Sequence, residues 1–247
     1  MTATAATADR PVLSIVVPFF NEADNLPPLI AQIDAVLAVI GVPAEIVLAN
    51  DGSTDGFARP ATSPNYPVRW LDLTERSGQS AAMYYGMQAA RGGYVGLLDA
   101  DLQNDPADLP RLFEMVRAGS FDLVTGIRRN RNDDWLRRTT SKIANAVRSR
   151  VLGDRTTDTG CSLKVLRADL AQRLPAWNGM HRFIPALAHS MGYATGETPV
   201  GHRARHAGVS KVLQGKRAWR ATVDMLGMVW LGRRQFKGRL VQSQPAE

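Results

Sequence analysis

The sequence lacks the features that mark several large classes of protein. It has one cysteine, Cys161, in 247 residues, which excludes an intramolecular disulfide and a zinc site built on several thiolates. No run reaches the roughly 18 uninterrupted apolar residues of a membrane-spanning helix, and residues 1–10 contain no apolar segment of a secretory signal. The hydrophobic content of 45% is typical of a globular chain. We therefore expect a cytoplasmic protein that at most lies on the inner face of the cell membrane.

Charged residues are unevenly distributed along the chain. Residues 1–127 carry 7 basic and 15 acidic residues, a net charge of −8, whereas residues 128–247 carry 23 and 8, a net charge of +15. Such asymmetry indicates an anionic partner, for which nucleic acid, anionic lipid and a phosphorylated substrate are the candidates. A solvated basic surface without a partner is the alternative. A P-loop is excluded as the phosphate site, because no G-x-x-x-x-G-K-[ST] motif is present.

Short apolar runs alternate with longer stretches of helical character in the first half of the chain. This alternation predicts an α/β fold in which a mostly parallel sheet carries helices on both faces. We expect strands at 12–17, 45–49, 68–73, 94–98 and 121–125, and helices at 27–40, 77–91 and 106–118, with Asn25 capping the first helix and Gly41 ending it. After Gly126 we expect helices at 135–151, 184–191 and 216–240, a strand at 162–166 and an extended segment at 195–203.

Two carboxylates follow the fourth predicted strand where it ends. Asp99 and Asp101 are two residues apart, and Gln103 adds a neutral oxygen. Ligands of open α/β sheets bind outside the carboxyl ends of the strands, and Mg²⁺ or Mn²⁺ usually takes one or two carboxylates together with substrate phosphates and waters. The pattern therefore predicts a divalent metal site. A turn of helix-capping aspartates is the alternative, since Asp105 precedes Pro106.

Two further turns at strand ends carry polar or aromatic side chains. Asp51, in the turn after the second predicted strand, offers a carboxylate that could accept a hydrogen bond from the imide of uracil or guanine. Phe20 and Glu22 follow the first predicted strand. Because the carboxyl ends of parallel strands meet at one edge of the sheet, the three turns can share one crevice.

The motifs together resemble those of a known family. They are VVPFFNE (16–22), NDGSTDG (50–56), RSGQSAAMYYG (76–86), LLDADLQNDP (97–106), GIR (126–128), DTGCSLKV (158–165), HRFIPAL (181–187) and HRARHAGVSK (202–211). Over about residues 12–211 the chain resembles the family 2 glycosyltransferases of GT-A fold. Within them it is most similar to the branch that transfers sugars to polyprenyl phosphates such as dolichyl and undecaprenyl phosphate.

The resemblance implies a role for each matching residue. It places the nucleotide-sugar at Pro18, Phe20, Glu22, Ala49, Asp51, Asp99, Ala100, Asp101, Arg128, Arg205 and Lys211. It places the metal at Asp99, Asp101 and Gln103, the acceptor phosphate at Lys164, Arg205 and Lys211, and catalytic roles at Asp101, Asp158 and Arg128. The family usually has tyrosine where this chain has Phe20, and often aspartate where it has Asn50.

The activity implied is that of a metal-dependent inverting glycosyltransferase that moves a sugar from GDP or UDP to a polyprenyl phosphate at the cytoplasmic membrane face. A polyprenyl phosphate is already anionic near neutral pH, so it needs no strong general base. A soluble or glycan acceptor is one alternative, and a nucleotidyltransferase, which would also use carboxylates at strand ends, is another. An alternative of another class is a nucleic-acid-binding module. The chain has no recognisable motif for it, and we expect no nucleic acid among its partners.

The carboxyl-terminal segment combines apolar and basic residues. Trp219, Val223, Leu226 and Trp230 recur at three- or four-residue spacing, and basic residues flank them. Interfacial helices on anionic membranes have this composition, and a helix packed on the enzyme's own core is the alternative. We expect a flexible start (1–10), a GT-A domain (11–212), a basic amphipathic tail that associates with the membrane (213–240) and a flexible end (241–247).

Overall fold

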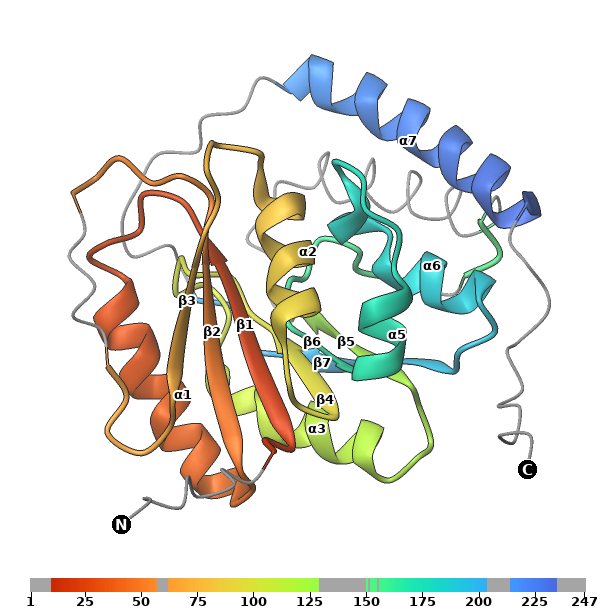
Figure 1. Ribbon diagram of the computed structural model, residues 1–247. Helices are drawn as coiled ribbons and strands as arrows, with labels where there is room; N and C mark the ends of the chain where they lie inside the picture. The colour runs from red at the N-terminus through yellow and green to blue at the C-terminus, as the bar shows by residue number, and fades with distance from the viewer. Residues whose placement is uncertain are drawn as a thin grey trace, which may run out of the picture.

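A seven-stranded sheet organises the computed structural model, which describes residues 10–56, 62–128, 150, 152–154, 156–203 and 214–234 (Figure 1). The strand order is β3-β2-β1-β4-β6-β5-β7. The strands are β1 (Leu13–Phe19), β2 (Ala44–Asn50), β3 (Val68–Asp72), β4 (Tyr94–Leu97), β5 (Leu123–Arg128), β6 (Lys164–Arg167) and β7 (Thr195–Val200). Only β6 runs antiparallel to its neighbours, so the mostly parallel sheet is confirmed.

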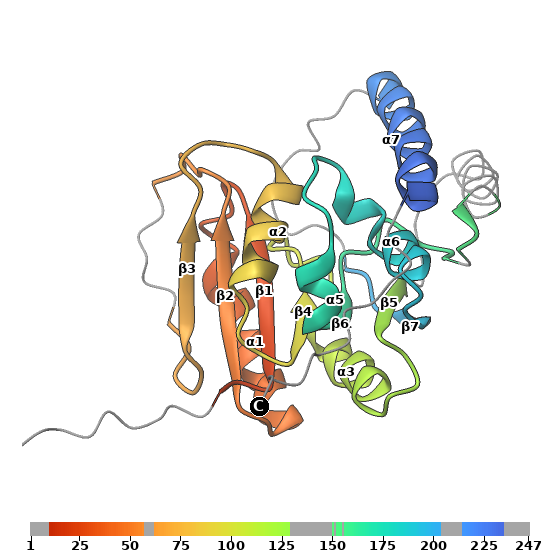
Figure 2. The ribbon, with the colours of Figure 1, turned by 45° about the vertical axis from the view of Figure 1, so that its right-hand side comes forward.

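Helices cover both faces of this sheet, as predicted (Figure 2). On one face lie α1 (Leu26–Ile40) and α3 (Leu109–Arg117), and on the other lie α2 (Gln79–Ala89), α5 (Ala168–Arg173) and α6 (Ile184–Ser190). Two short 3₁₀ helices, η1 (Pro106–Asp108) and η2 (Met180–Arg182), precede α3 and α6. A hydrophobic core lies on each face of the sheet, and successive side chains of β1 point alternately into the two cores. Ile15 packs in the core with α1, and Val16 packs in the core with α2.

Strand β1 continues through Pro18, where the sequence predicted its end. The neighbouring strand β4 ends opposite Val16, whose carbonyl accepts from Leu98 N. The main-chain nitrogen of Pro18 faces the same edge of β1 as the polar groups of Val16, but it lies beyond the end of β4. Because no strand is left to pair on this side, the missing N–H of the proline costs no ladder hydrogen bond. The strand therefore extends two residues further toward the carboxyl edge.

The starts of two helices differ from the expectation. Helix α2 begins at Gln79 rather than residue 77, because the main-chain N–H groups of Ser77 and Gly78 bind the carboxylate of Asp51. Asn25 lies at the N-cap of α1, but its side chain donates to Glu22 instead of capping the helix. The predicted helix 135–151 falls almost wholly on residues outside the described ranges.

Helix α7 (Gln214–Arg234) packs on α6 through one face. Met228 is buried in the core that α2, α5 and α6 share, and Asp224 pairs with Arg182 at 3.0 Å. Within the described ranges no helix combines the length and the apolar character needed to cross a bilayer.

Candidate active site

The turns after β1, β2, β3 and β4 meet around one cavity at the carboxyl edge of the sheet. The cavity has a volume of about 370 Å³. Its lining residues are Pro18, Phe19, Phe20, Glu22, Asp51, Arg76, Gly78, Gln79, Ala82, Asp99, Ala100 and Asp101. The structure thus brings together the three turns that the sequence singled out, and it adds the segment between β3 and α2.

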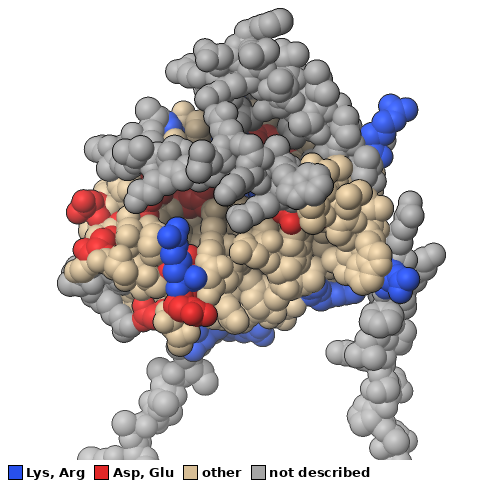
Figure 3. Space-filling view, turned by 90° about the horizontal axis from the view of Figure 1, so that it is seen from above, with Lys and Arg blue, Asp and Glu red and all other residues tan. Residues whose placement is uncertain are grey.

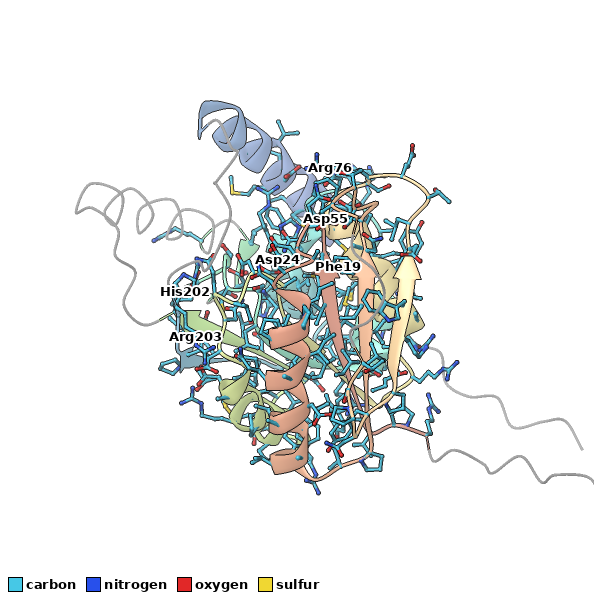
Figure 4. The ribbon with its side chains drawn as sticks, turned by 90° about the vertical axis from the view of Figure 1, so that its left-hand side faces the viewer. Phe19, Asp24, Asp55, Arg76, His202 and Arg203 are labelled. Atoms are coloured by element: carbon cyan, nitrogen blue, oxygen red, sulfur yellow. The ribbon has the colours of Figure 1, made fainter. Side chains whose placement is uncertain are left out.

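The turns after β1 and β2 are held to each other by hydrogen bonds. Asn21, in the left-handed region at φ 54°, accepts from Thr54 N at 2.7 Å. Its own N–H donates to Ser53 Oγ at 3.0 Å, and the carboxylate of Asp55 accepts from Ala23 N at 2.9 Å. Figure 4 shows Asp24, Asp55 and Arg76 around Phe19 at this edge of the sheet. These bonds fix the rim of the cavity from which Phe20 and Glu22 extend.

Asp51 organises one part of the cavity. Its carboxylate accepts from Ser77 N at 2.7 Å and from Gly78 N at 2.8 Å. A Cβ on Gly52, whose φ is +69°, would lie 3.0 Å from Arg76 N, so only glycine lets the two segments approach this closely. The guanidinium of Arg76 lies 4.1 Å from the ring centroid of Phe20. Aromatic, cationic and carboxylate groups therefore share one part of the cleft.

Asp99 and Asp101 line the same cleft. Gln79 donates to Asp99 across 2.8 Å. Burial, with a contribution from the charge of Asp101, raises the pKa of Asp99 above its ordinary value. Leu102 follows at φ 60°, a conformation that costs a bulky side chain about 1–3 kcal/mol and that clusters at functional sites. The turn therefore holds two carboxylates in an unfavourable arrangement that a bound cation would relieve.

This donor set suits a cation that draws most of its ligands from elsewhere. No group of three His, Cys, Asp or Glu side chains that could hold a metal occurs in the described part of the chain. Two carboxylates with substrate phosphates and waters are a usual environment of Mg²⁺ or Mn²⁺. Gln103 does not line the cavity, and its main-chain N–H donates to Asp101 at 3.2 Å.

Lys164 and the Arg128–Asp158 pair do not line the cavity, although Lys164 interacts with Asp99. Lys164 is buried, its ammonium donates to the carbonyl of Cys161, and burial lowers its pKa even though Asp99 acts in the opposite direction. Arg128 donates twice to Asp158, at 2.8 Å from Nε and 2.8 Å from Nη2. The charge of Arg128 is therefore compensated within the protein.

Other predicted site residues have different positions. Pro18, Glu22 and Ala100 line the cavity, whereas Ala49 is buried in β2 and does not. Arg205 and Lys211 lie outside the described residues.

Arg203, close before Arg205 and Lys211 in sequence, pairs with Asp105 at 2.6 Å, so the chain enters that segment beside the carboxylate turn (Figure 4). Sequence reasoning gave no site role to Arg76 or Gln79. Their position just after a predicted strand was the available signal.

Acidic side chains lie on the α1–β3 side of this end of the molecule in Figure 3. This agrees with the negative charge of residues 1–127, which supply every residue that lines the cavity.

The chain is similar to proteins whose activities are known. The model of "Glycosyl transferase family 2" matches residues 14–174. Dodecaprenyl-phosphate galacturonate synthase of Rhizobium johnstonii is 36% identical over 92% of this chain and 68% of its own length. Undecaprenyl-phosphate 4-deoxy-4-formamido-L-arabinose transferase of Pseudomonas fluorescens is 38% identical over 81% of this chain and 59% of its own length.

Among solved structures, glucosyl-3-phosphoglycerate synthase of Mycobacterium tuberculosis in complex with UDP has a TM-score of 0.68 at 20% identity. It covers 92% of this chain and 82% of its own. This likeness agrees with the predicted GT-A fold. The chain spans about 60 to 68% of the length of the two polyprenyl-phosphate enzymes. The sequence match to both enzymes and to the family model confirms the resemblance: the chain belongs to glycosyl transferase family 2.

Proposed function

We propose that the chain transfers a sugar from a nucleotide-sugar to a polyprenyl phosphate with the help of a divalent metal. The observation that carries this proposal is the single cleft that is lined by Phe20, Arg76 and Asp51 together with Asp99 and Asp101. A nucleoside diphosphate sugar needs such a site, with groups for the base at one end and charge compensation for the pyrophosphate at the other.

Two sets of similar proteins support the proposed acceptor and donor. The relatives at 36–38% identity are named for dodecaprenyl and undecaprenyl phosphate, which makes a polyprenyl phosphate the proposed acceptor. A structural neighbour with a TM-score of 0.64 and 18% identity was crystallised with Mn²⁺ and UDP, which agrees with a nucleotide donor and a divalent metal.

The residues of the cleft divide the work between them. Phe20 and Arg76 offer flat surfaces to the base, and Asp51 holds the segment that carries Arg76. Asp99 and Asp101 would hold the metal, which stabilises the charge that develops on the leaving pyrophosphate. The acceptor phosphate attacks as an anion, and a single displacement inverts the anomeric carbon. Arg205 and Lys211 are proposed phosphate contacts.

Asp158 and Lys164 take supporting roles in this proposal. Asp158 compensates Arg128 and also accepts from Gly160 N at 3.2 Å, so it shapes the segment between residues 156 and 164. Lys164 acts on Asp99 from inside the protein. A direct contact of Lys164 with the acceptor would require its ammonium to leave the Cys161 carbonyl.

The membrane face is the proposed place of the reaction. Val223, Leu226 and Trp230 on α7 are 49%, 60% and 60% exposed, on the side opposite buried Met228. One face of the helix packs on the core and the other presents apolar side chains, which supports the proposal that the exposed face contacts the membrane. An interfacial helix binds anionic membranes in this way.

Transfer into lipid tests the activity. Purified protein with radiolabelled UDP- or GDP-sugars, undecaprenyl phosphate and MgCl₂ or MnCl₂ should move label into an organic-solvent phase. Asp101→Asn should reduce the rate more than tenfold, a barrier increase above about 1.4 kcal/mol. The control is Asp24→Asn, an exposed carboxylate of the same rim that does not line the cavity. Label that stays in the aqueous phase on a soluble acceptor would refute the lipid acceptor.

Sedimentation with vesicles tests the membrane contact. Trp230→Glu should weaken binding to vesicles that contain phosphatidylglycerol, whereas Val39→Glu should not, although Val39 on α1 is 78% exposed. Equal sedimentation of the two variants would mean that α7 does not mediate binding.

A further inference from the structure

A histidine with no assigned role lies near the carboxylates of the cleft. His181 belongs to η2, and its Nδ1 lies 2.6 Å from Oγ of Ser80 in the first turn of α2. The residue before Ser80 is Gln79, which donates to Asp99. Gly179 N donates to the same Ser80 Oγ at 2.9 Å and holds the loop against this turn. The imidazole is therefore held by the same helical turn that contacts the carboxylates.

The hydrogen-bond network determines the tautomer of this histidine. Ser80 is buried, and its oxygen already accepts from Gly179 N. Within the described part of the chain, the hydroxyl hydrogen of Ser80 has one acceptor, Nδ1 of His181. Satisfying this hydroxyl within the described residues assigns the lone pair to Nδ1 and the ring hydrogen to Nε2.

The surroundings also keep the ring neutral. Burial, and after it the positive charges of Arg182 and Lys164, lower the pKa of His181 to about 3. Among the residues that the structure describes, no carboxylate contacts the ring, and the groups that act on it from α2, η2 and β6 are Ser80, Arg182 and Lys164. The imidazole therefore carries no charge at physiological pH.

The Nε2–H group remains available to a ligand. It has no partner among the described residues, and His181 is only partly buried. The loop that carries it borders the cavity, because a Cβ on the lining residue Gly78 would lie 3.7 Å from Oδ1 of Asn178. Lys164, which acts on Asp99, acts on His181 as well.

We propose that His181 is a neutral hydrogen-bond donor of the transfer site, held by Ser80 as the Nε2–H tautomer, and that it binds an oxygen of the transferred sugar or of the acceptor phosphate. The inference rests on the glycosyl transfer proposed above. A neutral donor binds such an oxygen without placing another positive charge beside Asp99 and Asp101. It is no general base, because Nδ1 is occupied and Nε2 carries the hydrogen.

Nuclear magnetic resonance tests the tautomer without any turnover. The full chain is labelled with ¹⁵N-histidine, and since it contains four histidines, loss of a signal in His181→Gln assigns the one of interest. We expect the Nε2–H pattern without titration from pH 8 to pH 5. Titration within this range, or the Nδ1–H pattern, would overturn the proposal.

Two probes then identify the oxygen. UDP-glucose with MgCl₂ should shift the Nε2 signal, and UDP should not, if the partner is the sugar. Citronellyl phosphate, a soluble short-chain acceptor, should shift it if the partner is the phosphate. No shift with either probe refutes the contact. If the protein transfers sugar to no acceptor, the proposed function fails, whereas these spectra still decide the tautomer and the contact.

Kinetics separate a substrate contact from a structural role. His181→Ala should lower kcat/KM at least tenfold for the substrate that it contacts, and His181→Gln, whose amide retains an N–H donor, should recover most of the loss. Ser80→Ala should also lower kcat/KM, because the ring is no longer held as one tautomer, but it should introduce no titration near pH 6.5, because burial still lowers the pKa of His181. The control is His189→Gln, on an exposed part of α6. Equal rates for His181→Ala and this control would overturn the contact.

Discussion

Replacing His181 by glutamine should change how the free energy of unfolding depends on pH. The folded protein holds the pKa of His181 at about 3, mainly through burial, against an ordinary value of 6.5. Between these values the unfolded chain binds a proton that the folded protein does not. The stability that the neutral ring contributes is therefore complete above about pH 6.5 and is lost as the pH falls toward 3.

The size of the effect follows from these two pKa values. Between pH 7 and pH 5 the unfolded histidine becomes almost fully protonated, and the folded one stays neutral. Linkage gives a loss of about 2 kcal/mol over this range. The result depends little on how far the folded pKa lies below 5, because the folded state binds almost no proton at pH 5.

Urea unfolding followed by tryptophan fluorescence at pH 7, 6 and 5 measures this loss. The wild-type protein and His189→Gln should both lose about 2 kcal/mol more than His181→Gln between pH 7 and pH 5, equivalent to about 4–8 °C in Tm for a chain of this size. The comparison uses the change with pH, so any constant destabilisation by the glutamine cancels. Equal pH dependence in His181→Gln and wild type would refute the assignment of a buried, neutral histidine.

Further substitutions test the packing and the metal site. Gly86→Ala should destabilise the protein by about 1–3 kcal/mol in thermal unfolding, because its Cβ would lie 2.4 Å from a valine methyl of β1. Gly227→Ala on α7 meets nothing within 4 Å and should stabilise by up to about 1 kcal/mol. Asp158→Asn should cost about 3 kcal/mol, since it leaves the partly buried Arg128 without its counter-charge. MgCl₂ or MnCl₂ with UDP should raise the Tm of the wild type, because a ligand at 100 times its Kd adds about 2.7 kcal/mol to the free energy of unfolding. The increase in Tm should be clearly smaller in Asp99→Asn.

The sequence predicts the regular part of this fold well because the signals there are local. The apolar run at 12–17 and Gly41 mark β1 and the end of α1, and both features act within a few residues of themselves. The predicted end of β1 at residue 17 was wrong, and the reason is non-local. Whether Pro18 stops a strand depends on where β4 ends, which no pattern near Pro18 records.

In the candidate site, too, the features that follow from local sequence were predicted and the contacts between distant residues were not. The position of Asp51 and Asp99 in one cavity followed from the rule that parallel strands end at one edge. The bonds of Asp51 to Ser77 and Gly78 did not follow, because they join residues 26 and 27 positions apart. The pairing of Arg128 with Asp158 likewise joins residues 30 positions apart. It compensates the charge of the arginine, for which the sequence predicted a contact with the nucleotide-sugar.

The buried position of Lys164 bears on how the cleft would attract the proposed cation. Asp99 and Asp101 repel each other, and their turn includes the left-handed Leu102, so the free protein needs a compensating charge near them. A lysine on the solvent side would compete directly with a metal ion for the same carboxylate oxygens. Lys164 acts instead from the protein side, where it reduces the cost of the negative pair without lining the cavity. A neutral His181 beside it has the same consequence, because it adds a hydrogen-bond donor to this end of the cleft without reducing the negative potential that draws the cation in.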